Sequence, residues 1–232
     1  MNYHKLAKEI KIIIDENLDQ ILELRSEKNL KKDNSYVSDG DILMNDLLKE
    51  YLLSLFNNHI YISEEDYIEK KNWKNTDSYI FVDPIDGTEN FVSGLKEWGV
   101  GISIFNKGEH YFSLIYMPEM NDFHYTGASI KKYNSRINGL SSSISLNELS
   151  RYQTNKNEIR IMGCSMYNIF NLIKGSFNSY ENIKGVNCWD ILPGINLALE
   201  SGCRVFVDNI EYKGQLLFPL KKYKVKLIHF YS

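Results

Sequence analysis

The chain has 232 residues, of which 43% are apolar and 25% charged, with a formal charge of −3 and a pI near 6.0. This composition is typical of a soluble globular protein and carries no basic footprint for nucleic acid or an anionic membrane. No apolar run approaches the roughly 20 residues that cross a bilayer, and the acidic amphipathic N-terminus differs from a signal peptide.

Three cysteines stand far apart in the chain, at positions 164, 188 and 203. Their odd number and wide spacing exclude a disulfide framework and a zinc site of the usual spacing. They predict reduced thiols in a cytoplasmic protein.

The first half of the chain predicts two helices followed by strands. Apolar residues recur at helical spacing over residues 3–25 and again over residues 41–56, with a polar loop between them. A short strand, HIYIS, ends on Glu64-Glu65-Asp66, and a later one, YIFV, ends on Asp83. From Trp98 the apolar period changes to two, which predicts an antiparallel meander over residues 98–126.

The second half mixes the two kinds of element. We expect a strand over 158–163, a helix over 165–175, a strand-like segment over 177–187, a helix over 190–202, and strands over 203–208 and 223–230. This alternation predicts an α+β (mixed α/β) fold built of layered helices and sheets. Because no linker interrupts the chain, we expect one domain, residues 1–232, with an N-terminal half of about 1–126 and a C-terminal half of about 127–232.

The segment YIFVDPIDGTENF, residues 79–91, ends a hydrophobic strand on two carboxylates three positions apart. A turn needs at most one Asp, so turn formation does not explain why both Asp83 and Asp86 are present. Pro84 stiffens the turn and fixes the directions of both side chains. The backbone carbonyl of Ile85, between the two acids, is a further candidate oxygen ligand.

The residues that follow predict a phosphate site. Gly87 permits close backbone approach, and Thr88 is a favourable N-cap for a short helix that ends at Gly94. Free N–H groups at a helix start favour phosphate. Metals beside such a helix start would make a phosphoryl site.

Acidic residues also lie at the boundaries of other predicted elements. Two carboxylates about 4 to 5 Å apart repel by roughly 3 to 4 kcal/mol at an effective dielectric of 20, so a convergent cluster needs a cation. All-oxygen ligands favour Mg²⁺, Mn²⁺ or Ca²⁺ over zinc or copper. Each acid alone has a plainer interpretation, as a surface turn, a solvated loop or a helix N-cap. The acids in question are Asp41, Glu64, Asp83, Asp86 and Asp190.

Two motifs together resemble the signatures of the inositol monophosphatase family of Mg²⁺-dependent, lithium-sensitive phosphatases. The first is DPIDGTENF, Asp83 to Phe91, and the second is WDILPG, Trp189 to Gly194. A glutamate pair about twenty residues before the first motif reads SEE here, where the family has Gly-Glu-Glu. The resemblance covers nearly the whole chain and implies the layered α-β-α-β-α sandwich of that family.

The resemblance implies a metal site with shared ligands. Glu64, Asp83 and the carbonyl of Ile85 would bind the first metal, and Asp83, Asp86 and Asp190 the second. It implies two or three Mg²⁺ ions per site, with Mn²⁺ as a substitute and Ca²⁺ or Li⁺ as inhibitors.

The resemblance also implies catalytic and substrate-binding roles. Thr88 and Glu64 would orient and deprotonate the attacking water, and Asp41 would lie near that water and a weaker third metal. The backbone N–H groups of Gly87 and Thr88 would hold the phosphate. The substrate-binding residues would be Gly87, Thr88, Gly163, Cys164, Ser165 and Glu181.

The chain departs from the family pattern on the substrate side. Lys31 and Ser35 stand in the loop before the second helix, with Ser35 replacing a family aspartate. MGCS, residues 162–165, replaces a Gly-Thr-Ala run. The family's inositol-binding Glu has no clean counterpart, although Glu181 and Asn182 lie nearby.

These observations predict a Mg²⁺-dependent phosphomonoester hydrolase acting on a small phosphorylated polyol, with inositol monophosphate as the leading substrate. Fructose 1,6-bisphosphate and 3′-phosphoadenosine 5′-phosphate are the alternatives, because sister families share the metal site. A regulatory protein-binding relative of these phosphatases is a further alternative. The resemblance implies a homodimer, and nothing predicts contact with nucleic acid or a membrane.

Overall fold

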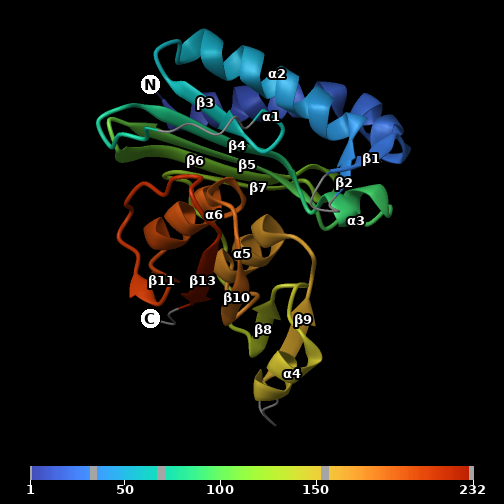
Figure 1. Ribbon diagram of the computed structural model, residues 1–232, viewed down its shortest axis with the longest axis vertical. Helices are drawn as coiled ribbons and strands as arrows, with labels where there is room; N and C mark the ends of the chain where they lie inside the picture. The colour runs from blue at the N-terminus through green and yellow to red at the C-terminus, as the bar shows by residue number, and fades with distance from the viewer. Residues whose placement is uncertain (1, 32–35, 67–71, 153–156, 230–232) are drawn as a thin grey trace.

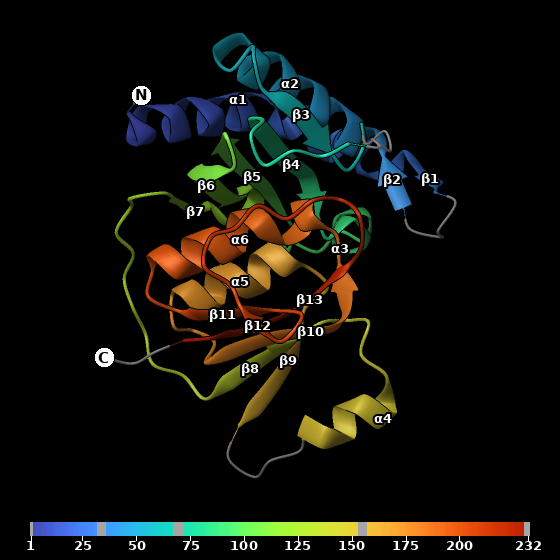
Figure 2. The same cartoon turned by 60° about the vertical axis from the view of Figure 1, so that its left-hand side comes forward.

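The computed structural model describes residues 2–31, 36–66, 72–152 and 157–229, which form stacked layers of helices and sheets (Figure 1). Helices α1 (Tyr3–Glu23) and α2 (Asp39–Leu55) cover one face of a five-stranded sheet. Helices α5 (Ser165–Ile173) and α6 (Cys188–Glu200) lie between that sheet and a six-stranded one (Figure 2). This mixed arrangement confirms the predicted fold class.

The first sheet has the strand order β3-β4-β5-β6-β7. The strands are β3 (Ile60–Ser63), β4 (Tyr79–Asp86), β5 (Gly99–Asn106), β6 (Glu109–Met117) and β7 (Asp122–Tyr125). Strands β5 to β7 form the predicted antiparallel meander, whereas β3 pairs with β4 in parallel. The short helix α3 (Thr88–Val92) follows β4 directly.

Strand β4 is buried along its whole length because both of its faces meet a hydrophobic core. Ile80 and Val82 pack into the core shared with α1 and α2. Tyr79 and Phe81 point to the opposite face, into the core shared with α5 and α6. This two-sided burial explains the unbroken apolar run YIFV.

The second sheet has the order β12-β11-β13-β10-β8-β9. Its strands are β8 (Ile137–Leu140), β9 (Glu158–Ile161), β10 (Ser179–Val186), β11 (Arg204–Val207), β12 (Ile210–Glu211) and β13 (Tyr223–Ile228). Beyond β8 and β9 lies the four-residue helix α4 (Leu146–Leu149), so the outermost helical layer is about one turn here. In the described residues, no helix has the length and apolar character of a membrane span.

Several predicted boundaries are corrected by backbone hydrogen bonding. The loop expected before residue 41 contains a hairpin of β1 (Lys28–Leu30) and β2 (Tyr36–Ser38), and Ser35 lies outside the described residues. Helix α2 begins at Asp39, because the Ser38 side chain caps it and accepts from the Asp41 N–H. Helix α6 begins at Cys188 rather than at residue 190, since Asn187 caps it.

Helices α5 and α6 pack closely at Gly194. A Cβ at Gly194 would lie 2.7 Å from Ile169 Cδ1 and 3.1 Å from Ile169 Cβ, so rotation of the isoleucine tip cannot relieve the contact. We expect Gly194→Ala to destabilise the protein by about 1–2 kcal/mol, because overpacking outweighs the better helix propensity of Ala.

Urea denaturation measures this change. Adding Ile169→Val to Gly194→Ala removes Cδ1 and should recover part of the loss. A Gly194→Ala variant more stable than wild type would contradict the packing argument.

Candidate metal centre

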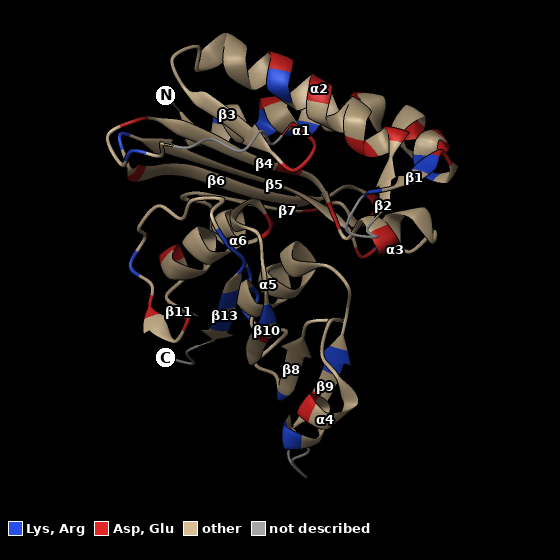
Figure 3. Cartoon of the chain, viewed as in Figure 1, with Lys and Arg blue, Asp and Glu red and all other residues tan. Residues whose placement is uncertain are grey.

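The acidic residues meet where β3, β4 and α6 come together. Because β3 pairs in parallel with β4, with Ser63 opposite Val82, the residues that follow, Glu64 and Asp83, lie at the same edge of the sheet. The Glu64 N–H donates to the Val82 carbonyl at 3.3 Å. Figure 3 shows acidic residues gathered where β3 and β4 end, next to α3.

Asp190 reaches the same place from the other half of the chain. It stands in the first turn of α6, where its Oδ2 accepts from the Asn187 N–H at 2.9 Å. Single carboxylate oxygens of Glu64, Asp83 and Asp190 lie within 4.8 Å of one another. The predicted convergence of acids that are distant in sequence is therefore present in the fold.

Asp86 lines the same cavity but has partners for one oxygen. A register shift in the pairing of β4 with β5 falls between Asp83 and Asp86, and Pro84 lies inside β4 and not in the turn that the sequence predicted. Asp86 Oδ2 accepts from the Cys164 thiol at 3.1 Å and from the Met166 N–H. Burial, which outweighs these hydrogen bonds, raises the pKa of Asp86 to about 7.

The donor set fits a hard divalent cation. Asp83 Oδ1 and Asp190 Oδ1 are buried without a hydrogen-bond partner in the described part of the chain. Burial and the neighbouring carboxylates, Glu64 first among them, raise the pKa of Asp83 and of Asp190 well above the usual range. An unpaired buried carboxylate is costly, and a cation bound by these oxygens would remove that cost. The cavity they line has a volume of about 250 Å³.

Lys31 is the cation nearest to Glu64 in the structure. Its amine donates to Glu64 at 2.7 Å and to Glu65 at 2.8 Å. Burial disfavours the charge, but the two carboxylates outweigh burial and raise the pKa of Lys31. The positive charge of Lys31 is therefore already balanced by Glu64 and Glu65.

The Thr88 hydroxyl lies between the Asp41 carboxylate and the end of strand β4. Its hydroxyl lies 3.2 Å from Asp41 Oδ1 and 3.1 Å from the Ile85 carbonyl oxygen. The prediction that Thr88 is the N-cap of α3 is wrong, because Gly87 holds that position at a φ of 85°. The left-handed backbone at Gly87 turns the chain and frees the Thr88 hydroxyl to face Asp41.

Asp41 is buried, and its pKa is raised above the ordinary value. Its Oδ2 accepts from the Ser38 N–H at 2.8 Å and from the Ser38 hydroxyl at 2.6 Å. Burial, opposed by these hydrogen bonds, raises the pKa of Asp41 to about 6. The side chain can therefore exchange a proton near neutral pH.

Five of the six predicted substrate-binding residues lie in two adjoining cavities. Gly87, Thr88 and Gly163 line the acidic cavity with the carboxylates. Cys164 and Ser165 line a neighbouring cavity of about 220 Å³, which shares Asp86, Gly163 and Asp190 with the acidic one. A Cβ at Gly87 would lie 2.9 Å from Cys164 Cβ, so the glycine permits the two segments to approach.

Glu181, the sixth predicted substrate-binding residue, does not line either cavity. Side chains alternate along β10, and Tyr180 and Asn182 face the neighbouring cavity. Glu181 therefore points to the other face, where it lies 3.7 Å from the Lys226 amine. Asn187 and Lys222 also line the acidic cavity, although neither was predicted as a site residue. Asn187 was foreseeable as the cap of α6, but nothing in the local sequence marks Lys222.

Comparison with known proteins places the chain in a family. A model of the inositol monophosphatase family matches residues 3–145. The chain therefore belongs to this family of phosphomonoester hydrolases, as its two signature motifs predicted.

The individual relatives have different names, and they match different lengths of this chain. The 3′(2′),5′-bisphosphate nucleotidase CysQ of Haemophilus influenzae is 32% identical over 113 residues, which cover 47% of this chain and 41% of that protein. The Nus factor SuhB of Pasteurella multocida is 26% identical over 195 residues, or 75% of this chain and 72% of that protein. A lithium-soaked staphylococcal inositol monophosphatase has a TM-score of 0.82 at 16% identity, covering 99% of this chain and 91% of that one, which supports the fold.

The raised pKa values of the buried aspartates predict an unusual dependence of stability on pH. Between the ordinary Asp pKa of 3.8 and about 7, folded Asp86 holds a proton that the unfolded chain has released. The free energy of unfolding of the metal-free protein should therefore fall by about 2 kcal/mol or more as the pH rises through this window. Saturating Mg²⁺ should abolish this decline, because the ionised carboxylates then bind the cation.

Thermal unfolding at pH 5 and pH 7.5, in chelator or in Mg²⁺, measures the effect. Asp190→Asn serves as the control, since it removes one repelling charge and should weaken both the decline and the Mg²⁺ response. Metal-free protein that gains stability from pH 5 to pH 7.5 would contradict the assignment.

Proposed function

We propose that the protein hydrolyses a small phosphomonoester by attack of a metal-activated water, with Mg²⁺ as the natural cation. The observation that carries this proposal is the convergence of Glu64, Asp83 and Asp190, with two buried oxygens lacking partners. All the donors are hard oxygens, which suit Mg²⁺ and, as substitutes or inhibitors, Mn²⁺ and Ca²⁺.

The family resemblance names the residues that would hold the cations, and the structure brings three of them, Glu64, Asp83 and Asp190, together. Glu64, Asp83 and the Ile85 carbonyl would bind one, and Asp83, Asp86 and Asp190 the other. When bound, such cations supply a water of lowered pKa and neutralise charge on the phosphoryl oxygens.

Thr88 and Asp41 would orient the water and accept its proton. A threonine hydroxyl has one proton and two lone pairs. When the Thr88 hydroxyl donates to Asp41 Oδ1, its lone pairs are available to accept a hydrogen bond from water. The pKa of Asp41 near 6 makes it a competent acceptor for a proton relayed through that hydroxyl.

A covalent intermediate is not needed in this scheme, and the thiol that contacts Asp86, that of Cys164, is unsuited to form it. Cys164 is buried and donates to Asp86. Burial and the negative charge of Asp86 raise the pKa of the Cys164 thiol well above its ordinary value. The thiolate that nucleophilic attack requires is therefore disfavoured.

Inositol monophosphate, the leading substrate from sequence, suits the hydroxyl-rich cavity next to the acids. That cavity is lined by polar groups that can pair with a polyol, among them Ser142, Ser165 and Asn182. A nucleoside 3′,5′-bisphosphate is the second candidate, supported by the name of the Haemophilus relative. Cytoplasmic location and a homodimer remain predictions of the sequence.

A substrate panel tests the function. Inositol monophosphate, fructose 1,6-bisphosphate and 3′-phosphoadenosine 5′-phosphate are assayed for phosphate release with and without Mg²⁺. Release from at least one of them, only with Mg²⁺, is expected. If none is hydrolysed, the hydrolase proposal fails, and a regulatory role such as the name of the Pasteurella relative suggests takes its place.

Removing the Thr88 hydroxyl should separate catalysis from metal binding. Thr88→Ala should lower kcat by about 10²- to 10⁴-fold, because the water loses its orienting acceptor, while the rise in melting temperature with Mg²⁺ persists. Thr88→Ser keeps a hydroxyl and should retain most activity. A Thr88→Ala enzyme with the kcat of wild type would remove Thr88 from the mechanism.

A further inference from the structure

Asp66 ends the acidic run Glu64-Glu65-Asp66 and takes no part in the proposed chemistry. It is the last residue of the turn that follows β3, and its partners lie on helix α2. Its Oδ2 accepts from the Asn45 side-chain amide at 2.9 Å and from the Lys49 amine at 2.8 Å. The turn is therefore tied to α2 two residues after the candidate metal ligand Glu64.

Asn45 is buried, although its side chain is polar and stands inside a helix. Its exposed fraction is only 2%. Its Oδ1 accepts from the Tyr61 hydroxyl at 3.1 Å, while its Nδ2 donates to Asp66. Tyr61 lies in β3, three residues before Glu64. One buried amide thus joins the strand before Glu64 to the turn after it, and both polar atoms of the amide are hydrogen-bonded.

Helix α2 contacts the ends of two neighbouring parallel strands through one of its faces. Asp41 and Asn45 are both buried and are four positions apart, so they share a face of the helix. Asp41 contacts Thr88, just beyond β4, and Asn45 contacts Asp66, just beyond β3. The same helix face is therefore anchored at both strand ends from which candidate metal ligands reach the acidic cavity.

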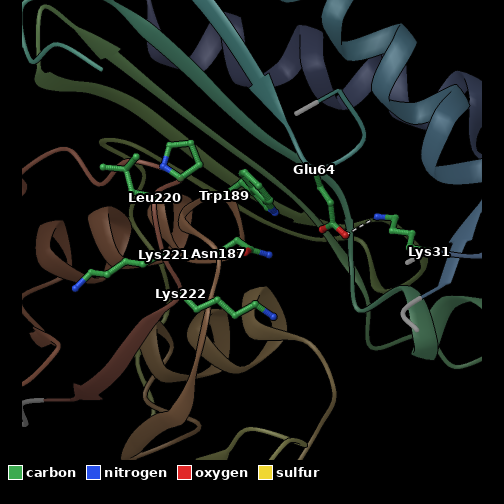
Figure 4. Close-up of a pocket in the computed structure, with 8 residues that line it drawn as sticks. Lys31, Glu64, Asn187, Trp189, Leu220, Lys221 and Lys222 are labelled. Carbon is green, nitrogen blue, oxygen red and sulfur yellow. Dashed lines mark hydrogen bonds and ion pairs between the residues drawn. The ribbon is translucent and has the colours of Figure 1, made fainter. Parts of the chain in front are cut away.

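The turn after β3 has a second tether, but a bound cation would oppose it. Lys31 forms ion pairs with Glu64 and with Glu65, and Figure 4 shows the first of them. A divalent cation at Glu64 would repel the Lys31 ammonium and compete with it for the same carboxylate. Asn45 is uncharged, and it contacts an acid that binds no metal in the proposed site. Its hydrogen bond to Asp66 can therefore persist when the cation is bound.

We infer that Asn45 is a positioning residue for the metal site, which fixes the turn that carries Glu64 by contacting Tyr61 and Asp66 on either side of it. Because Glu64 is repelled by the other carboxylates of the cavity, a turn released from Asn45 would move away from them and lose its place as a ligand. This inference rests on the proposed function, since it takes Glu64 to bind the cation.

Replacing Asn45 by an apolar side chain of similar size tests the inference without changing the charge. In Asn45→Leu the affinity for Mn²⁺, measured from the electron paramagnetic resonance signal of the free ion, should fall by about 10- to 100-fold, the usual effect of losing a contact behind a metal ligand. Asp66→Ala is the second variant, in case the buried change prevents folding. It alters a partly exposed turn and should lower the affinity in the same direction.

Exchanging the two side chains should restore the contact with donor and acceptor reversed. In Asn45→Asp/Asp66→Asn the amide at position 66 donates to the carboxylate at position 45, the Tyr61 hydroxyl keeps an acceptor, and the net charge is that of wild type. This double variant should keep most of the Mn²⁺ affinity. Asn45→Asp alone sets two carboxylates against each other and should lose affinity, although its added negative charge would by itself attract the cation.

Two further variants separate positioning from general stability. In a Glu64→Gln background, Asn45→Leu should cause no further loss of Mn²⁺ affinity, because the ligand through which it acts is already impaired. Leu52→Val shortens a fully buried side chain of the same helix. It should lower the melting temperature in chelator and leave the Mn²⁺ affinity unchanged.

The possible failures are distinguishable. A wild-type protein that binds no Mn²⁺ would overturn the proposed metal chemistry, and the inference with it. Wild-type binding that is unchanged in Asn45→Leu would overturn the inference alone. An equal loss of affinity in Leu52→Val would also overturn it, as would a full loss from Asn45→Leu in the Glu64→Gln background, because Asn45 would then not act through Glu64.

Discussion

Mutual repulsion of converging carboxylates, partly or fully buried, is the constraint on which the rest of this structure depends. Glu64, Asp83 and Asp190 offer oxygens within 4.8 Å of one another, and two of those carboxylates have an oxygen with no partner in the described structure. At such separations like charges cost kilocalories per mole, and burial adds to that cost. A cation bound by these oxygens would remove this cost, and the relief would contribute to its affinity.

The three acids come together from two layers of the fold. Glu64 and Asp83 stand at the ends of two parallel strands of the first sheet, while Asp190 comes from a helix packed between the sheets. Strand β4 has a hydrophobic core on each face, so its end is held from both sides. Close contacts such as that of Gly194 with Ile169 hold α6 in register with its neighbour. The rigidity of the site is therefore a property of the packing on both sides of it.

The site residues that could be predicted from the sequence are those that stand in a motif or at the end of a predicted element. Asp83 and Asp86 stand in a motif whose spacing has no structural need, and Glu64 and Asp190 lie at the ends of recognisable elements. The hairpin of β1 and β2 was missed because each of its strands is only three residues long. Thr88 was mistaken for a cap because Gly87 takes that position by a left-handed backbone that sequence alone does not reveal.

The substrate side was harder to predict, since it depends on strand register. Glu181 and Asn182 are neighbours in sequence, yet they face opposite sides of β10, and only the pairing with β13 decides which one meets the cavity. Lys221 and Lys222 pose the same problem, because one pairs with Asp208 and the other borders the site. Such choices are made by tertiary packing and not by residue type.

The most direct test of this account is to locate the cation. A crystal of the protein grown with Mn²⁺, measured at the manganese absorption edge, reveals the ion by its anomalous scattering. Peaks in contact with the carboxylates of Glu64, Asp83 and Asp190 are the predicted result. A fully ordered site with no manganese peak, or with manganese bound only elsewhere, would contradict the claim that these acids converge to hold a metal.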